Sequence, residues 1–265
     1  MTTHTAPGGT PPLLETRQLT VGIGERVFCQ ALDLALHPGE CLAVLGRNGS
    51  GKSTLLSVLA GVRAAQGGEV LIDGATYAHW GIRRSALIRG WLPQAGQDAF
   101  ASTVLETALT GRHPHLDRWS WESESDARIV RDALAAVDLA AFEQRDVRTL
   151  SGGERQRLAI ATLLTQQPKL LLLDEPITWL DLKHQIAMLE LFAECARKQG
   201  VAVVMVLHDP SLAWRFCDLS LLIYGDGQAE TGPTQSLLSA EKLSLLFQHP
   251  LQALEHEGKT SFVPA

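Results

Sequence analysis

"CLAVLGRNGSGKST", residues 41–54, combines three features that together decide the fold. The apolar run at 41–45 predicts a strand buried on both faces, as in a parallel sheet covered by helices. The residues from Gly46 to Ser53 fit the phosphate-loop pattern G-x-x-x-x-G-K-[ST], and a helix is predicted after them, stopping at Gly61. A strand, a glycine-rich loop and a helix in this order predict an α/β fold with a mainly parallel core sheet.

The glycine-rich loop predicts a site for the phosphates of ATP. Its glycines let successive backbone N–H groups turn toward phosphate oxygens, and the following helix adds the positive end of its dipole. In this pattern Lys52 reaches the β- and γ-phosphates, and the Ser53 hydroxyl binds Mg²⁺, so ATP and Mg²⁺ are the expected cofactors. The residues predicted to bind the nucleotide here are Gly46, Asn48, Gly49, Ser50, Gly51, Lys52, Ser53 and Thr54.

Three further apolar runs end in polar side chains that suit phosphate chemistry. They lie in "GWLPQ" (90–94), "KLLLLDEP" (169–176) and "VAVVMVLHDP" (201–210). Ligands of open α/β sheets gather at the carboxyl ends of strands, so these side chains are expected to meet the glycine-rich loop. Asp174 is predicted to bind the metal ion, and Glu175 to accept a proton from the attacking water. His208 is predicted to act at the γ-phosphate, and Gln94 on Mg²⁺ or on the water.

A second glycine-rich stretch, "LSGGERQR" at 150–157, lies far downstream of the first. Ser151 and Glu154 form a capping-box pattern at the start of an amphipathic helix. A capped helix start with two glycines also presents free N–H groups and a positive dipole end, so it is another anion site. One compact fold does not bring both sites to the same nucleotide. We therefore expect two copies to pack head to tail, so that this second site of one copy closes over the γ-phosphate held by the first site of the other.

The rest of the pattern predicts one domain with an inserted helical lobe. Strand-like runs disappear after residue 95, and segments such as "SESDARIVRDALAAVDL" favour helices instead. An antiparallel β part is expected near the N-terminus, and "LSLLIYGDGQAETG" predicts two strands joined by a tight turn. The predicted boundaries are a disordered tail at 1–12, a single domain at 13–251 with the lobe at about 95–166, and a C-terminal tail at 252–265.

The composition indicates a soluble globular protein and gives no sign of nucleic-acid binding. Of the 265 residues 45% are hydrophobic, and a net charge of −6 argues against a basic face. The longest apolar runs are far shorter than the roughly 20 residues of a membrane-spanning helix, and no secretory signal pattern is present. Four cysteines without CxxC spacing are expected to be buried and reduced, which favours a cytosolic protein. They are Cys29, Cys41, Cys195 and Cys217.

Taken together, these motifs resemble the ATP-binding cassette (ABC) family over residues 14–251. The resemblance assigns Walker A to 46–54, the Q-loop to Gln94 and the signature to 150–157. It assigns Walker B to 170–175, the D-loop to 179–181 and the switch histidine to His208. Within the D-loop, it implies a catalytic role for Asp181. It implies a P-loop NTPase fold and an ATP-sandwich dimer of two copies of the chain. In that dimer Ser151 and Gly153, with Gly152 between them, contact the partner's nucleotide. It also implies that Gln94 and the helical lobe sense a membrane permease.

Two positions depart from the family pattern. The aromatic residue that usually stacks on adenine shortly before the second strand is replaced by Ile23, so the way in which adenine is held is not given by the resemblance. Losing that contact is expected to relax the preference for ATP over GTP. The D-loop approach carries Ile177 and Trp179 where smaller or polar residues are usual. We expect Trp179 to pack at the dimer interface.

Two segments, at 103–116 and 180–191, resemble the importers of metal chelates. That group takes up siderophore-iron, haem or cobalamin with a periplasmic binding protein. The resemblance implies an ATPase subunit at the cytoplasmic face of the inner membrane, bound to permease subunits. His113 and His115 lack partners at ligand spacing and are expected on a loop surface, not at a metal site.

A soluble cassette ATPase that serves an assembly system, such as iron–sulfur cluster biogenesis, is the alternative. Residues 95–120 discriminate between the two, because a permease would dock there. A DNA-repair or ribosome-associated cassette is disfavoured by the absence of long coiled coils, a second cassette or a basic face. An exporter is less favoured because no membrane domain is fused.

Overall fold

The computed structural model describes residues 11–94, 101–117, 123–256 and 258–265. Its elements are β1 (Leu14–Ile23), β2 (Arg26–Leu36), β3 (Cys41–Leu45), α1 (Lys52–Leu59), β4 (Gly67–Ile72), β5 (Ala75–Thr76), α2 (Tyr77–Ile88), β6 (Arg89–Leu92), α3 (Val104–Leu109), η1 (Thr110–His115), α4 (Glu124–Ala136), η2 (Ala140–Phe142), η3 (Val147–Thr149), α5 (Gly152–Thr165), β7 (Leu170–Leu173), α6 (Leu182–Gln199), β8 (Ala202–Val206), α7 (Pro210–Phe216), β9 (Leu219–Ile223), β10 (Ala229–Pro233), α8 (Thr234–Leu237), α9 (Ala240–Phe247), β11 (Leu251–His256) and β12 (Lys259–Pro264). No helix in these ranges combines the length and apolarity needed to cross a membrane. The predicted N-terminal tail lies almost wholly outside the described residues.

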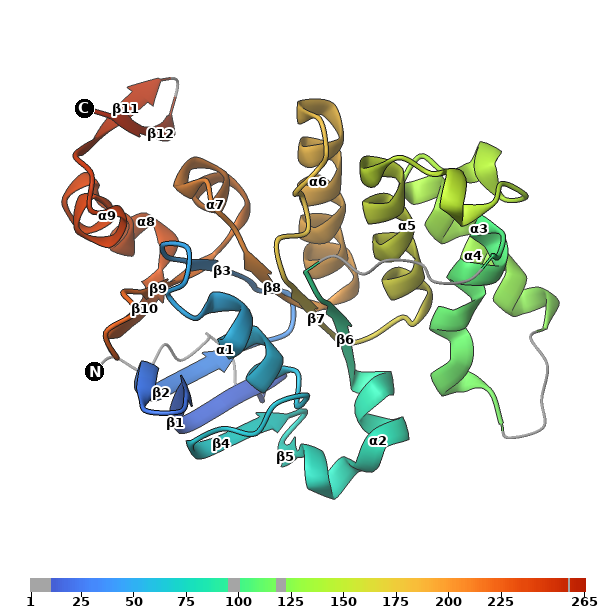
Figure 1. Ribbon diagram of the computed structural model, residues 1–265, viewed down its shortest axis with the longest axis horizontal. Coiled ribbons are helices and arrows are strands. Elements are labelled where there is room, and N and C mark those ends of the chain that lie inside the picture. The colour runs from blue at the N-terminus through green and yellow to red at the C-terminus, as the bar shows by residue number, and fades with distance from the viewer. Residues whose placement is uncertain (1–10, 95–100, 118–122, 257) are drawn as a thin grey trace.

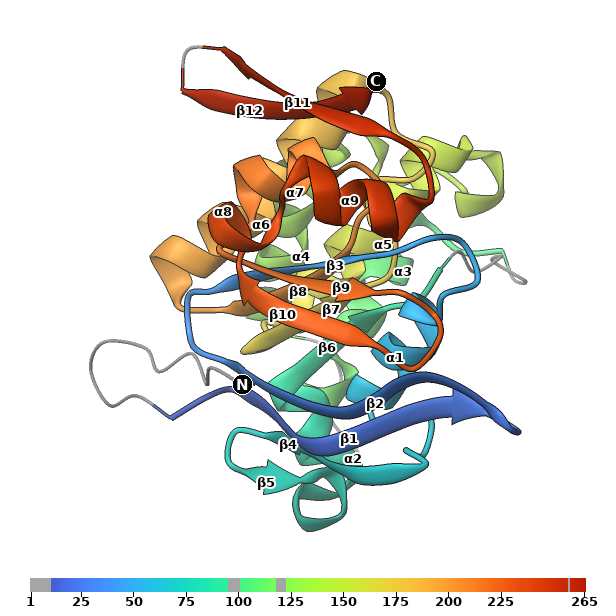
Figure 2. The same ribbon diagram turned by 90° about the vertical axis from the view of Figure 1, so that its left-hand side faces the viewer.

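A six-stranded sheet forms the centre of the molecule. Its order is β10-β9-β3-β8-β7-β6, in which β10 pairs antiparallel with β9 and the other pairs are parallel. β3, β7, β8 and β9 are buried along their whole length, which explains why their sequences are continuous apolar runs. Figure 2 shows α6, α7 and α9 on one side of this sheet and α1 on the other. The predicted α/β class with a mainly parallel core sheet is confirmed.

Parallel pairing brings four strand ends to one edge of this sheet. The register pairs at that edge are Val44 with Val206, Leu173 with Met205, and Leu92 with Leu173. The segments that follow β3, β8, β7 and β6 therefore begin side by side. These are the segments that carry the phosphate loop and the polar side chains predicted to act on the nucleotide.

The first strands form the expected antiparallel part, a second sheet of order β2-β1-β4-β5. α1 lies between the two sheets (Figure 2), and its Leu55, Leu56 and Leu59 are buried in a cluster that draws apolar side chains from both. Because α1 starts at the phosphate loop, this packing fixes the loop with respect to both sheets.

The helical elements between β6 and β7 form the group at the right of Figure 1. Arg112 and Asp126 make a buried ion pair there, with Nε and Oδ1 2.8 Å apart. Arg112 also donates to the Thr165 carbonyl oxygen at 2.8 Å. Hydrogen bonds from Ser123, aided by Arg112, lower the pKa of Asp126 to about 2. One guanidinium thus joins η1, the start of α4 and the end of α5.

The C-terminal residues form a β-hairpin, so the prediction of a tail at 252–265 was wrong. β11 and β12 pair antiparallel in register from Leu251 with Pro264 to His256 with Lys259. Phe262 is buried, and its ring centroid lies 5.7 Å from that of Trp214 in α7. Its backbone N–H donates to Ser211 Oγ at 3.0 Å. The hairpin is held by α7, a distant part of the sequence, so local pattern alone did not reveal it.

All four cysteines are buried and free, as predicted. Burial raises the pKa of Cys29 to about 11 and that of Cys41 to about 12. Their thiols are therefore protonated at neutral pH and act as small apolar packing groups.

Candidate nucleotide-binding site

The phosphate loop is tightly packed at two of its glycines, Gly46 and Gly51. A Cβ added at Gly46 would lie 2.5 Å from the Ile223 carbonyl oxygen, and one at Gly51 would lie 2.4 Å from the Phe28 ring. Gly51 has a φ of 99°, in the left-handed region that favours glycine. α1 then begins at Lys52 without a side-chain cap. The loop thus leaves backbone donors at a helix start, where the dipole favours an anion.

Lys52 is held inside this loop. Its Nζ donates to the carbonyl oxygens of Gly46 at 2.8 Å and Arg47 at 3.0 Å. Burial lowers the pKa of Lys52, while the negative charges of Glu175 and Asp174 act in the opposite direction. An enclosed cation beside uncapped backbone donors suits an anionic ligand.

Ser53 and Asp174 form the part of the site that fits a divalent cation. Ser53 Oγ donates to Asp174 Oδ1 at 3.1 Å, which joins the start of α1 to the end of β7. The described residues contain no group of three or more His, Cys, Asp or Glu side chains placed to hold a metal ion. A cation between Ser53 and Asp174 therefore draws further ligands from phosphate and water oxygens, which is how proteins usually bind Mg²⁺.

Asp174→Asn is expected to stabilise the nucleotide-free protein. Burial is the largest cause that raises the pKa of Asp174 above its usual 3.8, so its ionised form is disfavoured in the fold. The destabilisation is absent below the usual pKa of 3.8, grows between that value and the raised pKa, and is complete above the raised pKa. Asparagine keeps the acceptor for Ser53 and removes the charge. We expect the Tm at pH 7 to rise by about 2–4 °C, the shift that roughly 1 kcal/mol produces in a chain of this size.

Thermal unfolding without nucleotide, followed from pH 7 downward, measures this effect. The gap between Asp174→Asn and the parental chain is expected to close as the pH falls and Asp174 protonates. Asp132→Asn on the exposed side of α4 is the matched control and is expected to leave the Tm unchanged. A lower Tm for Asp174→Asn at pH 7 contradicts the argument.

Glu175 and His208 form a second polar pair at the same edge. Glu175 Oε1 lies 2.9 Å from His208 Nε2, and the two side chains are 13% and 47% exposed. Glu175 lies two residues after the end of β7 and has a φ of 52°, which is uncommon for a residue with a side chain. The Thr178 hydroxyl donates to Glu175 Oε2 at 3.4 Å. A carboxylate held on both oxygens next to the loop is placed to orient and deprotonate a water molecule.

The phosphate loop, Gln94 and Glu175 line one pocket of about 400 Å³. The structure also brings Arg26 and Phe28 of β2 into its lining, which the sequence had not singled out. The signal that would have found them is the hairpin register, because Arg26 is the cross-strand neighbour of Ile23. Asn48, Gly49, Gly51, Lys52, Ser53 and Thr54 complete the lining.

The signature residues lie elsewhere. Ser151 caps α5, and the predicted capping box is confirmed: Glu154 N donates to Ser151 Oγ at 3.2 Å and Ser151 N to Glu154 Oε2 at 2.7 Å. Ser151 and Gly152 are exposed. Ser151, Gly152 and Gly153 are not among the residues that line the pocket of the phosphate loop. In Figure 1, α1 and α5 lie on opposite sides of β6 and β7. One chain therefore holds two separate candidate anion sites.

The D-loop residues lie against the signature. Trp179 is 73% exposed with a φ of 70°, and a Cβ on Gly153 would lie 3.1 Å from its carbonyl oxygen. Asp181 caps α6 and accepts from His184 N at 2.9 Å and His184 Nδ1 at 2.8 Å. Hydrogen bonds from His184 lower the pKa of Asp181. Asp181 is thus kept ionised at the side of the molecule that carries the signature.

Comparison with known proteins gives the deciding observation. The family model described as ABC transporter matches residues 29–178, more than half of the chain. The hemin import ATP-binding protein HmuV of Myxococcus xanthus is 40% identical over 252 residues, which is 92% of this chain and 93% of that protein. The chain belongs to the ABC transporter family.

Further ABC proteins match most of the chain in sequence or in structure. The petrobactin import ATP-binding protein FpuD of Bacillus anthracis is 40% identical over 225 residues, 82% of this chain and 81% of its own length. A solved metal-chelate type ABC transporter in an inward-facing conformation aligns with a TM-score of 0.83 and 30% identity over 96% of this chain and 98% of that one. A dimeric ATP-binding cassette bound to ADP and Pi aligns with a TM-score of 0.72 and 25% identity over 83% of this chain and 98% of that one.

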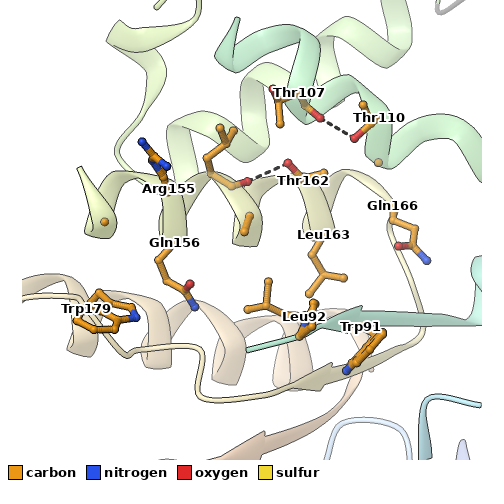
Figure 3. A pocket seen from close by; sticks show the side chains of 15 residues that line it. Trp91, Leu92, Thr107, Thr110, Arg155, Gln156, Thr162, Leu163, Gln166 and Trp179 are labelled. Atoms are coloured by element: carbon orange, nitrogen blue, oxygen red, sulfur yellow. Dashed lines mark hydrogen bonds between the residues drawn. The ribbon is translucent and has the colours of Figure 1, made fainter. Parts of the chain in front are cut away.

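In this ABC chain a groove of about 560 Å³ is lined by residues of β6, α5, α3 and η1 and by Trp179 (Figure 3). Trp91 and Leu92 line the strand side, and Gln156 and Leu163 line the helix side. Trp179 lies at one end of the groove. Gln156 Nε2 donates to the Pro176 carbonyl oxygen at 2.9 Å. The groove thus runs between the strand that leads to Gln94 and the helical lobe. Gln166, next to the end of α5, also reaches β6, because its Nε2 donates to the Arg89 carbonyl oxygen at 2.9 Å.

Proposed function

We propose that this chain is the ATP-binding and ATP-hydrolysing subunit of an ABC importer that takes up a metal chelate. One observation carries the ATPase part: Lys52, the Ser53–Asp174 pair and the Glu175–His208 pair meet at one sheet edge. The importer part is supported by relatives whose names specify hemin and petrobactin import and by the metal-chelate type neighbour. Siderophore-iron, haem and cobalamin are the cargo classes that this proposal includes.

The nucleotide is bound by the phosphate loop, with its backbone donors on the phosphate oxygens and Lys52 on the β- and γ-phosphates. The residues that would hold Mg²⁺ are Ser53, Asp174 and Gln94, whose side chains offer the oxygen ligands that this cation prefers. When bound, Mg²⁺ neutralises charge on the phosphate oxygens. Glu175 accepts the proton of the attacking water, and His208 holds that carboxylate from 2.9 Å away and reaches the γ-phosphate.

The active form is a head-to-tail dimer of two copies. Ser151, Gly152 and Gly153 of one copy close over the nucleotide on the phosphate loop of the other, which accounts for an exposed helix start outside the pocket. Trp179 lies next to the signature, and Asp181 follows two positions later at the start of α6, so we place both at the same interface. The solved dimeric cassette bound to ADP and Pi supports self-association of this chain.

The dimer drives a permease at the cytoplasmic face of the inner membrane. We place the permease contact on Gln94 and on the helical lobe, around the groove between α5 and β6. ATP-driven closure and hydrolysis-driven reopening of the dimer move this groove and thereby the permease. A periplasmic binding protein delivers the chelate from the other side and does not touch this chain.

A pull-down of the tagged chain in mild detergent, with partners identified by mass spectrometry, tests the importer proposal. We expect a multi-helix permease as the main partner, recovered in the presence and absence of ATP. A soluble scaffold protein without any membrane partner contradicts the proposal and favours an assembly ATPase, such as one of iron–sulfur cluster biogenesis. The ATP chemistry is the same in both cases.

A further inference from the structure

The antiparallel sheet presents one side of a hairpin to the nucleotide pocket. Ile23 ends β1, Arg26 begins β2, and the two are register partners. Directly opposed residues in an antiparallel pair point to the same face of the sheet, so Ile23 and Arg26 stand side by side. Ile23 is 49% exposed, and Arg26 lines the pocket.

Arg26 is held in place by two contacts. Its guanidinium carbon lies 4.9 Å from the centroid of the Phe28 ring, a cation–π arrangement. Its Nη2 donates to the Gly49 carbonyl oxygen at 2.9 Å. Phe28 in turn fills the space next to Gly51, where no Cβ fits. The guanidinium is therefore positioned against the phosphate loop although its side chain is exposed.

The lining of the pocket orients a bound nucleotide. Glu175 and Gln94 follow strands of the parallel sheet and mark the end where the γ-phosphate reacts. Arg26 and Phe28 come from the antiparallel sheet. The phosphate loop lies between these two residues and the γ-phosphate end: Gly51 packs against the Phe28 ring, and burial lowers the pKa of Lys52 while the negative charge of Glu175 acts in the opposite direction. With the γ-phosphate at Glu175, the nucleoside leaves the loop on the side of Arg26.

We propose that the nucleobase stacks on Arg26, with Ile23 as its apolar neighbour, in place of an aromatic side chain. This inference rests on the proposed nucleotide-binding function and identifies the residue on which the base stacks. A planar guanidinium stacks on the face of an aromatic ring, and Phe28 beneath it keeps that plane from turning away. Every base has such a face, so stacking distinguishes adenine from guanine weakly. ATP and GTP are therefore expected to bind with similar affinity.

Arg26→Ala tests the proposal by equilibrium competition against a fluorescent nucleotide, with ATP, GTP and inorganic tripolyphosphate as competitors. We expect Arg26→Ala to weaken ATP and GTP by a similar factor of about 3 to 30, the range of a cation–π contact. Binding of tripolyphosphate, which has no base, is expected to stay the same. Arg26→Lys keeps the charge and loses the plane, and it is expected to behave like Arg26→Ala. Glu25→Ala, in the same exposed turn, is the control that leaves all three ligands unchanged.

Other outcomes overturn the proposal in distinguishable ways. Equal weakening of ATP and tripolyphosphate by Arg26→Ala means that Arg26 contacts phosphate and not the base. Unchanged binding of all three ligands means that the base lies elsewhere. Lys52→Ala is expected to weaken ATP and tripolyphosphate together. If Lys52→Ala binds both ligands as the parental chain does, the proposed nucleotide site itself fails, whatever Arg26→Ala shows.

Discussion

Glu175→Gln is expected to slow ATP hydrolysis by about 10²- to 10⁴-fold, the usual contribution of a general base. Glutamine keeps the size of the side chain and an oxygen that His208 Nε2 can reach from its 2.9 Å position. It has no basic oxygen to accept the proton of the attacking water. Lys52 and the backbone donors of the phosphate loop are untouched, so ATP affinity is expected to stay within about twofold, the scatter of a neutral change.

Steady-state phosphate release and equilibrium ATP binding, measured on the same preparation, separate chemistry from binding. Glu241→Gln is the matched control, because it makes the same chemical change on exposed α9 and is expected to turn over normally. Turnover of Glu175→Gln at the parental rate would show that Glu175 is not the base. Loss of ATP binding in this variant would instead show that Glu175 shapes the phosphate pocket.

Ser151→Arg is expected to abolish hydrolysis while the variant still binds ATP on its own phosphate loop. Ser151 lies outside the pocket that contains Lys52, so an arginine there does not touch the nucleotide of its own chain. In a head-to-tail dimer the same arginine enters the partner's nucleotide site and blocks closure. The substitution also removes the cap of α5, which costs about 0.5–2 kcal/mol.

Ser123→Arg controls for the lost cap and the added charge, because Ser123 also caps a helix of the lobe through a capping box. It is expected to hydrolyse ATP if the interface reading of Ser151 is correct. Mixing tagged Ser151→Arg chains with Lys52→Ala chains gives the sharper test. Each variant alone is expected to be inactive, and the mixed dimer is expected to regain activity, since one of its sites combines an intact loop with an intact signature. Parental turnover by Ser151→Arg alone contradicts the head-to-tail dimer.

The core of the fold was predictable because its decisive features are local in sequence. A buried parallel strand is a short apolar run, and the polar residue after it is next to it in the chain. Gly46, Gln94, Asp174 and His208 each follow such a run, so their convergence followed from the rule that parallel strands end at one edge. The capping box at Ser151 was predictable for the same reason.

The features that were missed depend on contacts between distant segments. Arg26 enters the pocket because of the hairpin register, which was the available signal, and because Phe28 packs against Gly51, which has no sequence signature. The hairpin of β11 and β12 was read as a tail because its strands are mostly exposed and lack a clear apolar alternation. Phe262 anchors this hairpin by packing on Trp214, and this contact between distant residues has no signature in the local sequence.

That anchor connects the segment after His208 to the C-terminal hairpin through α7. α7 begins at Pro210, two positions after His208, and Phe262 is fastened to the same helix through Trp214 and the Ser211 hydroxyl. If closure of the nucleotide site displaces His208, we expect α7 to pass that displacement to the hairpin. A fluorophore on the exposed Gln252 of β11 is expected to report such a displacement of the hairpin, at a surface remote from the phosphates.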